Sequence, residues 1–298
     1  MSFLSFSYIN ILGFLPFIVF LLQLSSGILS SIYYNDFFTI ASDPIIYIII
    51  NINNGWFIRI LHVIGASLFI LFTFFHFIRA IWIKLKNIYI QFIAVVVIIS
   101  GQIIFVLSMI EGFLGYLLSW GQMPYWGITV MINIVAVLPC FGIVIAELIW
   151  SAAWVILNRI FVYHFLLGIL IILFILIHIL LPHNFSSSNP SINNNTSIIS
   201  SYPFIFKDLY SSFITITIII SIFLYWEPDI LGNSDNQIIA NPLPTPNNIL
   251  PEWYYLLFHS ILRSFPDKTI GVIIVLNILT TMALIRLLYY RFFIVMLK

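Results

Sequence analysis

Charged residues are scarce in this chain: Asp, Glu, Lys and Arg make up 7% of its 298 residues. A soluble domain usually carries about 25% charged residues. Hydrophobic residues make up 62% of the chain, and the mean hydropathy is +1.13. So few charges cannot cover a water-facing surface, which predicts that the lipid bilayer is the solvent. The formal net charge of +1 gives no basis for binding nucleic acid.

Cysteine is almost absent, because Cys140 is the only one. A single cysteine excludes an intramolecular disulfide, a multi-cysteine zinc site and an iron–sulfur cluster held by this chain alone. Any iron would therefore be held mostly by histidine. The N-terminus also lacks a basic segment, since the first Lys or Arg is Arg59. It resembles neither a signal peptide nor an Arg-rich transit peptide, so we expect the first apolar stretch to be retained.

Long apolar runs are the dominant feature. A spanning helix needs about 20 mostly apolar residues. This predicts an all-α polytopic membrane protein with about six spans, at residues 9–33, 58–83, 89–118, 160–181, 211–226 and 270–290. The stretch 127–150 is also apolar, but it contains Asn133, Pro139 and Glu147, so we expect helices lying at the membrane surface. One side then gathers basic residues, as the positive-inside rule requires of the cytoplasm or matrix: Lys84, Lys86, Lys207, Arg286, Arg291 and Lys298.

Histidines recur at one spacing on two of the expected spans. His62 and His76 are 14 residues apart on the second span, and His164 and His178 are 14 apart on the fourth. Fourteen residues make about four turns of α-helix and about 21 Å along its axis, so each pair shares one face. Two such helices facing each other offer two stacked His–His pairs, each able to ligate one haem iron from both sides. A haem with both axial positions filled suits electron transfer.

Two plainer explanations compete with haem. A lone intramembrane histidine often hydrogen-bonds a neighbouring helix. The histidines could also bind a metal ion without haem. Polar groups in lipid are costly and usually functional, so two matched pairs favour a cofactor over packing. Ligands about 21 Å apart cannot share one ion, so bare metal would need two separate sites.

Glycines have the same spacing on the first and third spans. Gly13 and Gly27 are 14 residues apart, as are Gly101 and Gly115. A porphyrin is a broad plate that packs closely against a helix only where a Cβ is missing, and Gly supplies that gap. Close helix packing by small residues would explain either pair alone. The period shared with the histidines favours a four-helix bundle that stacks two haems.

Two arginines flank the histidines of the second span. Arg59 precedes His62 by three residues, and Arg79 follows His76 by three. Each would lie at a haem edge, where a guanidinium can pair with a propionate. Snorkelling to the membrane interface explains them equally well.

The spans and polar segments divide the chain into two expected parts. Residues 1–184 form the four-helix haem-binding bundle with the surface helices at about 127–150. Residues 185–298 form a shortened C-terminal part with two spanning helices and a loop carrying PEWY. The segments 183–201 and 227–252 are rich in Ser, Asn and Pro, so they must lie in water or against protein.

Several long motifs stand out: GWFIRILHVIGASLF and FFHFIRA in the second span, GYLLSWGQMPYWG at the end of the third, HNFSSSNP, the KD pair at 207–208, and PEWYYLLFHSILRSFPDK. They resemble the cytochrome b family of ubiquinol–cytochrome c reductase (complex III). The likeness runs from about residue 9 to about 290. It implies the catalytic subunit of a quinol–cytochrome c oxidoreductase. Such a subunit oxidises quinol at an outer site, carries electrons through two b haems and reduces quinone at an inner site, coupled to proton translocation.

The resemblance also assigns roles by position. It implies that His62 and His164 ligate a low-potential haem near the outer side, and that His76 and His178 ligate a high-potential haem near the inner side.

Quinol oxidation would take place between the GQMPYWG and PEWY segments. Glu252 would accept a quinol proton, as a carboxylate in a partly apolar pocket can, with Tyr254 of PEWY and Gly127 lining the same pocket. Three residues match the inner site, where titratable groups can deliver protons: His183, Lys207 and Asp208.

The implied partners are a Rieske iron–sulfur protein, a membrane-bound c-type cytochrome and other complex III subunits in a homodimeric complex. The implied location is the mitochondrial inner membrane, multi-pass and organelle-encoded, with ubiquinone as substrate. Departures from the family include the lack of two further C-terminal helices that are usual, His259 in place of a tyrosine in the quinol pocket, and Ile128 in place of a smaller residue there. The alternatives are a dihaem membrane anchor of another quinone-linked dehydrogenase, and a transporter or structural subunit without haem.

Overall fold

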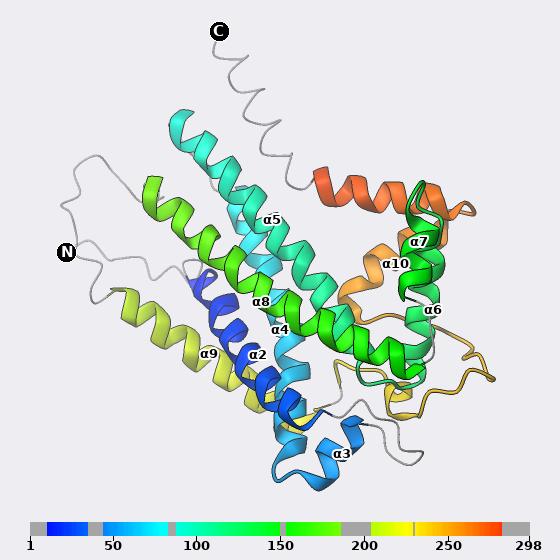
Figure 1. The fold of residues 1–298 in the computed structure, drawn as a ribbon. Helices are drawn as coiled ribbons and strands as arrows, with labels where there is room; N and C mark the ends of the chain where they lie inside the picture. Colours follow the sequence, from blue (N-terminus) through cyan, green and yellow to red (C-terminus); the bar gives the residue numbers. More distant parts are fainter. Residues whose placement is uncertain are drawn as a thin grey trace, which may run out of the picture.

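The structure is a computed structural model, which describes residues 11–34, 44–82, 88–149, 153–185, 204–228 and 230–281. Within these ranges five helices are long and apolar enough to cross a membrane. They are α2 (Phe14–Tyr33), α4 (Gly55–Trp82), α5 (Ile88–Leu117), α8 (Ala153–Phe185) and α9 (Phe204–Trp226). The long helices run alongside one another in a tilted bundle (Figure 1). The prediction of an all-α polytopic membrane fold is confirmed.

The observed helices differ from the expected spans mainly at their ends. The fifth span is longer than predicted, because α9 begins at Phe204 rather than near residue 211. In place of the sixth span there is an apolar helix at Lys268–Thr281, and the rest of the expected 270–290 span lies outside the described residues. A short helix that the sequence did not predict, α3 (Pro44–Asn51), precedes α4.

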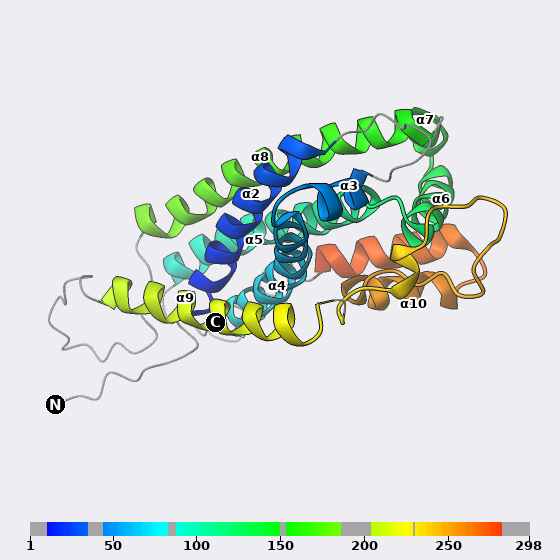
Figure 2. The ribbon, with the colours of Figure 1, turned by 90° about the horizontal axis from the view of Figure 1, so that it is seen from below.

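The apolar stretch 127–150, expected to form helices at the membrane surface, is not one continuous helix. Its position at the membrane surface stays a prediction. The stretch is divided into α6 (Gln122–Ala136) and α7 (Gly142–Ile149). The break contains Pro139, which has no N–H to donate, and Cys140, whose φ of 71° lies in the left-handed region. Either helix alone is shorter than the roughly 20 residues that crossing requires. Both lie beside one end of the bundle, near α10 (Leu256–Ser264) (Figures 1 and 2).

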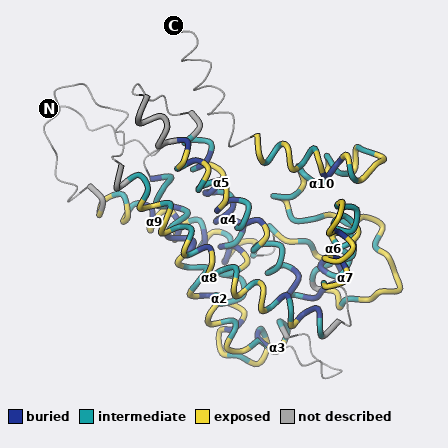
Figure 3. Tube along the Cα trace, turned by 45° about the horizontal axis from the view of Figure 1, so that its top comes forward, coloured by how far each residue is buried: buried dark blue, intermediate teal, exposed yellow. Residues whose placement is uncertain are grey.

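The spanning helices pack as two pairs, α2 with α4 and α5 with α8, while α9 covers α2 and α4. Buried residues lie along the inward sides of these helices, and the outward sides are exposed (Figure 3). A hydrogen bond joins α2 to α4, because Gln23 Nε2 donates to the His62 carbonyl over 2.9 Å. Gly65 makes room for this amide, because a Cβ there would lie 2.0 Å from Gln23 Nε2.

The segment before PEWY is anchored to the start of α6 by Gln122. Its backbone N–H donates to the Ile238 carbonyl over 2.8 Å, and its Nε2 donates to the Pro244 carbonyl over 2.9 Å. Its Oε1 accepts from the Asn241 N–H over 2.7 Å. Gln122 is 6% exposed, so these bonds are shielded from water and hold the polar segment against the bundle.

Replacing Gln122 with alanine is expected to release this segment. The change leaves the Asn241 N–H and the Pro244 carbonyl without partners, at a cost of about 1–3 kcal/mol. Limited proteolysis should then cut residues 230–252 faster in Gln122→Ala than in the unsubstituted chain. Gln122→Glu keeps the acceptor and loses the donor, so it should be cut at an intermediate rate. Equal rates for all three would contradict the anchoring role.

Candidate functional site

Four histidines face one another in two pairs inside the bundle. The ring centroids of His62 and His164 are 6.2 Å apart, with the ring planes at 88°. Those of His76 and His178 are 6.3 Å apart, with the planes at 80°. Metal–imidazole nitrogen bonds are about 2.0 Å long, so two rings that hold one metal from opposite sides have centroids about 6 Å apart. Each pair therefore has the separation that a shared axial metal requires.

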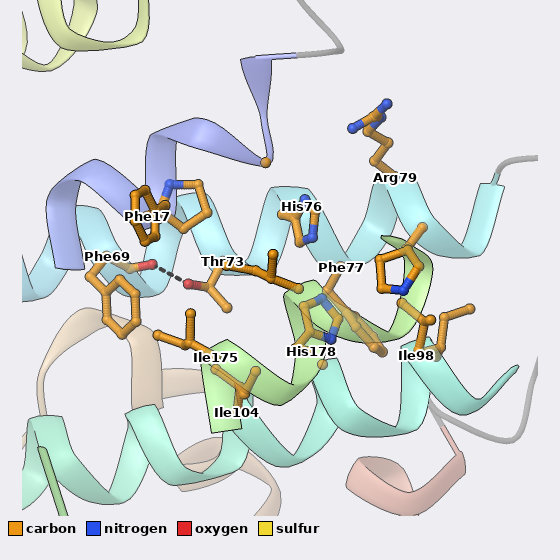
Figure 4. Close-up of a pocket in the computed structure, with 17 residues that line it drawn as sticks. Phe17, Phe69, Thr73, His76, Phe77, Arg79, Ile98, Ile104, Ile175 and His178 are labelled. Carbon is orange, nitrogen blue, oxygen red and sulfur yellow. Dashed lines mark hydrogen bonds between the residues drawn. The ribbon is translucent and has the colours of Figure 1, made fainter. Parts of the chain in front are cut away.

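Helices α2, α4, α5 and α8 enclose a cavity of about 280 Å³ at the level of His76 and His178. The two imidazoles point toward each other across it, among Phe17, Phe69 and Ile175 (Figure 4). No group of three or more His, Cys, Asp or Glu side chains able to hold a metal occurs among the described residues. Within the described part of the chain, a bare ion between two of these histidines would therefore lack a third side-chain ligand of these four types, whereas a haem supplies four nitrogen ligands of its own. The apolar lining and the facing imidazoles fit a flat iron macrocycle.

Hydrogen bonds fix the tautomer of two of these histidines. Ser26 Oγ donates to the Leu22 carbonyl over 2.6 Å and lies 2.9 Å from His62 Nδ1. Ser100 Oγ donates to the Val97 carbonyl over 2.7 Å and lies 2.7 Å from His178 Nδ1. A hydroxyl has one proton to donate, so each serine accepts from the Nδ1–H of its histidine.

His164 is fixed in the same way by α5. Its Nδ1 lies 3.0 Å from Glu111 Oε1 and 3.2 Å from the Glu111 carbonyl oxygen. When Nδ1 carries the proton and donates it to a neighbour, Nε2 keeps a free lone pair, and the hydrogen bond fixes the orientation of the ring. A metal-ligating imidazole has this arrangement. Three of the four rings are therefore held in the form that binds a metal.

The glycines lie directly against the histidine rings of their own helix pair. A Cβ on Gly27 would lie 3.1 Å from His62 Cε1, and one on Gly13 would lie 3.6 Å from His76 Cε1. On α5, the corresponding distances are 3.2 Å from Gly101 to His178 Cε1 and 2.8 Å from Gly115 to His164 Cε1. Glycine at these positions gives the imidazoles the space to stand between the helices.

These distances predict a graded response to alanine. Gly115→Ala would force the His164 ring to move, because real Cβ atoms do not approach to 2.8 Å, and we expect haem content to fall. Gly13→Ala would make an ordinary contact with His76 at 3.6 Å and should retain more haem than Gly115→Ala. The haem-to-protein ratio of purified complexes measures both variants. Equal losses in the two would contradict the steric argument.

The arginines occupy the positions expected for them on α4. Arg79 lines the edge of the cavity beside His76 and His178 (Figure 4). Arg59 is partly buried in the first turns of α4, one turn before His62. Their expected pairing with haem propionates stays a prediction.

Glu252, which is expected at the outer site, directly precedes the short helix η2 (Trp253–Tyr255) that leads into α10. Tyr116 donates to Asn236 Oδ1 over 2.9 Å, and Asn236 in turn hydrogen-bonds the Glu252 carboxyl. Burial raises the pKa of Glu252 to about 7, an effect that the Asn236 hydrogen bond partly offsets. This carboxyl can therefore gain and lose a proton near neutral pH.

Tyr254 and Tyr255 pack with Phe258 against Ile70, Phe105 and Met109. Burial, followed by the charge of Glu252, raises the pKa of Tyr254, so its hydroxyl remains a donor. Tyr255 donates its hydroxyl proton to the Met109 carbonyl. These contacts fix PEWY against the middle of the bundle.

The other residues expected at the outer site lie on α6 and α10. Gly127 faces Tyr116, whose Cε1 would be 3.9 Å from an added Cβ. Ile128 is 2% exposed and packs in a cluster that includes Leu117 and Leu157. His259 is half-buried on α10, and its pKa is lowered by burial and by Arg263.

The residues expected at the inner site belong to the end of α8 and the start of α9, on the side of the bundle away from α10 (Figures 1 and 2). Lys207 is exposed and Asp208 partly buried in the first turns of α9. His183 belongs to the last turn of α8, and its side chain lies outside the described residues. The grouping of these three residues around a quinone stays a prediction.

Sequence reasoning missed the partners of the histidines. Ser26 and Ser100 each precede one of the periodic glycines, and Glu111 precedes another by four residues. These offsets were visible in the sequence. They could not be interpreted from the sequence, because the contact of each side chain with a histidine ring depends on the register between neighbouring helices.

Comparison with known proteins agrees with this geometry. The family model described as "Cytochrome b/b6/petB" matches residues 2–186, and "Cytochrome b(C-terminal)/b6/petD" matches residues 239–292. The "Cytochrome b" of Daucus carota is 37% identical over 267 residues, which cover 87% of this chain and 66% of that protein. The "Cytochrome b" of Mycena viridimarginata is 38% identical over 274 residues, covering 90% and 69%.

A solved structure titled "Hyperthermophilic respiratory Complex III" superposes with a TM-score of 0.80 at 26% sequence identity, covering 95% of this chain and 76% of that one. The chain spans about two thirds of the length of the carrot and fungal proteins. The first family model therefore covers the helices that carry the paired histidines, and the second covers the PEWY motif. The chain belongs to the cytochrome b/b6 family, whose members bind haem b, and is a divergent cytochrome b of the respiratory complex III type.

Proposed function

We propose that this chain holds two b haems, one between His62 and His164 and one between His76 and His178. The observation that carries the proposal is the pair of centroid separations, 6.2 and 6.3 Å. The Nδ1 hydrogen bonds of three of these rings support it, because they leave Nε2 available to a metal. Each haem, when bound, would supply a one-electron carrier without an open axial site.

We further propose that the chain is the catalytic subunit for quinol oxidation in a quinol–cytochrome c oxidoreductase. Glu252 would take a proton from quinol, since burial brings its pKa to about 7. The protonated Tyr254 hydroxyl would orient the substrate, and Gly127 would leave space for it. At the opposite end, Lys207, Asp208 and His183 would bind quinone and deliver protons to it.

The proposal includes the setting of the chain. The substrate would be ubiquinol, and the complex would be a homodimer containing a Rieske iron–sulfur protein and a membrane-bound c-type cytochrome. It would lie in the mitochondrial inner membrane, with the chain organelle-encoded. A first part at 1–184 would carry the haems, and a second part at 185–298 would complete the outer site with PEWY. A dihaem anchor of another dehydrogenase is less favoured, because it does not account for the packing of PEWY and Glu252 beside the bundle.

The test is quinol-driven reduction of cytochrome c by the complex purified from its native membrane. We expect activity that an outer-site inhibitor abolishes, together with two b-type components of different potential in the reduced-minus-oxidised spectrum. A dihaem spectrum without cytochrome c reduction would favour the dehydrogenase anchor. The lack of any b-type spectrum would leave only a transport or structural role.

A further inference from the structure

An acidic side chain lies inside a membrane span at the level of one histidine pair. Glu111 belongs to α5, within the spanning segment Val95–Leu117. Its Oε1 is 3.0 Å from His164 Nδ1, and its own backbone carbonyl is 3.2 Å from the same nitrogen. Ionisable residues within spans are costly and generally functional. The reaction proposed above gives Glu111 no part.

The surroundings of Glu111 are shaped to hold its carboxyl group. Gly168 on α8 lies one turn after His164, on the same helix face, and a Cβ there would come within 3.2 Å of Glu111 Oε1. Glu111 Oε2 is buried and has no hydrogen-bond partner among the described atoms. A buried polar atom left unpaired costs about 1–3 kcal/mol, so packing alone gives no reason to place a carboxyl here.

The four histidines therefore have unequal acceptors at Nδ1. His62 and His178 donate to neutral serine hydroxyls, and the acceptor next to His76 is the neutral backbone carbonyl of Leu12. His164 is the one ring of the four whose Nδ1 faces a carboxyl group. A stronger acceptor on Nδ1 makes the imidazole a more electron-rich metal ligand, and hydrogen bonding around the axial ligands is one of the levers that set a haem potential.

We infer that Glu111 is a positioning residue that lowers the reduction potential of the haem held by His62 and His164, by accepting the Nδ1–H of His164. The inference rests on the proposed binding of haem by the histidine pairs. The hydrogen bond from His164 to Glu111 would separate the reduction potentials of the two haems. Electrons would then pass in the favourable direction, from the outer pair to the inner pair.

Redox titration of the b-type absorbance in the purified complex tests this role. In Glu111→Gln, the amide is a weaker acceptor, so one component should move to higher potential by a tenfold or greater shift in its reduction equilibrium, about 59 mV for one electron. The other component should stay unchanged. The shifted component should be the one that survives in His76→Ala. Glu147→Gln removes a carboxylate from an exposed position on α7 and should move neither component.

Gly168→Ala keeps the carboxyl but presses on Oε1, so it should shift the same component in the same direction by a smaller amount. This second variant retains the test if Glu111→Gln fails to assemble. The role of Glu111 would be overturned if both components kept their potentials in both variants, or if the component that shifted were the one that His76→Ala removes. Either result would leave the proposed haem binding standing. The absence of any b-type component in the unsubstituted complex would overturn the proposed function as well.

Discussion

Replacing His76 with alanine is expected to remove one of two b-type components and leave the other intact. His76 and His178 face each other at 6.3 Å across the cavity, so losing one imidazole leaves the iron with a single protein ligand. His62 and His164 lie on the same two helices about 21 Å away, so the haem between them keeps both of its protein ligands. The haem-to-protein ratio should fall to about half, as expected when one of two six-coordinate sites is lost.

His259→Ala is the matched control for haem content, because His259 lies on α10 outside the four-helix bundle. It should retain the full ratio. Quinol should still bind at the outer site of His76→Ala. Tyr254 lies against Gly112, and Glu252 is joined through Asn236 to Tyr116, which follows the glycine at the His164 ring. Loss of both components from a chain that still assembles would contradict the assignment of two separate pairs.

Replacing Glu252 with glutamine is expected to lower the rate of quinol oxidation by roughly 10²- to 10⁴-fold, the usual contribution of a positioned general base. Burial raises the pKa of this carboxyl to about 7. Below that pH it is mostly protonated and cannot accept a proton, and above it the carboxylate is available. The rate of the unsubstituted complex should therefore rise as the pH increases through about 7 and then level off.

The glutamine variant should lose this pH dependence together with its activity, because an amide does not titrate in this range. Steady-state rates between acidic and alkaline pH measure both effects. Glu227→Gln is the control, since Glu227 is an exposed glutamate just after α9. A pH profile for Glu252→Gln with the same midpoint as the unsubstituted complex would assign the titration to another group.

The sequence predicted the pairing of the histidines across the bundle well because its signal is helical periodicity. A separation of 14 residues places two side chains on one helix face whatever the rest of the fold does. The same rule put Gly13 with Gly27, and Gly101 with Gly115, each pair on one helix face. The structure shows them against the imidazole rings, and their expected contact with a porphyrin stays a prediction. The prediction needed only that each span be one unbroken helix, and α4, α5 and α8 meet that condition.

The hydrogen-bond partners of the rings could not be predicted in this way. Ser26 and His62 are 36 residues apart in sequence, and Ser100 and His178 are 78 apart. Such contacts depend on the axial register between neighbouring helices, which packing of side chains decides rather than periodicity. Gln23 and Gly65 show how one polar contact and one missing Cβ set that register for α2 and α4.

The outer site was predicted as two motifs but not as a connected group. Asn236 joins Tyr116 to Glu252, yet it lies in a polar segment without periodicity. Its position depends on the anchoring of that segment by Gln122, 114 residues earlier in the sequence. Short helix α3 was missed because an apolar run of eight residues is equally compatible with other conformations.

Density from an experimental map of the native complex would test the haem assignment most directly. We predict two flat tetrapyrrole densities, one between the rings of His62 and His164 and one between those of His76 and His178. Each should be joined to Nε2 of both imidazoles. Density for lipid or packed side chains between the rings, or imidazoles turned away from each other, would contradict the account.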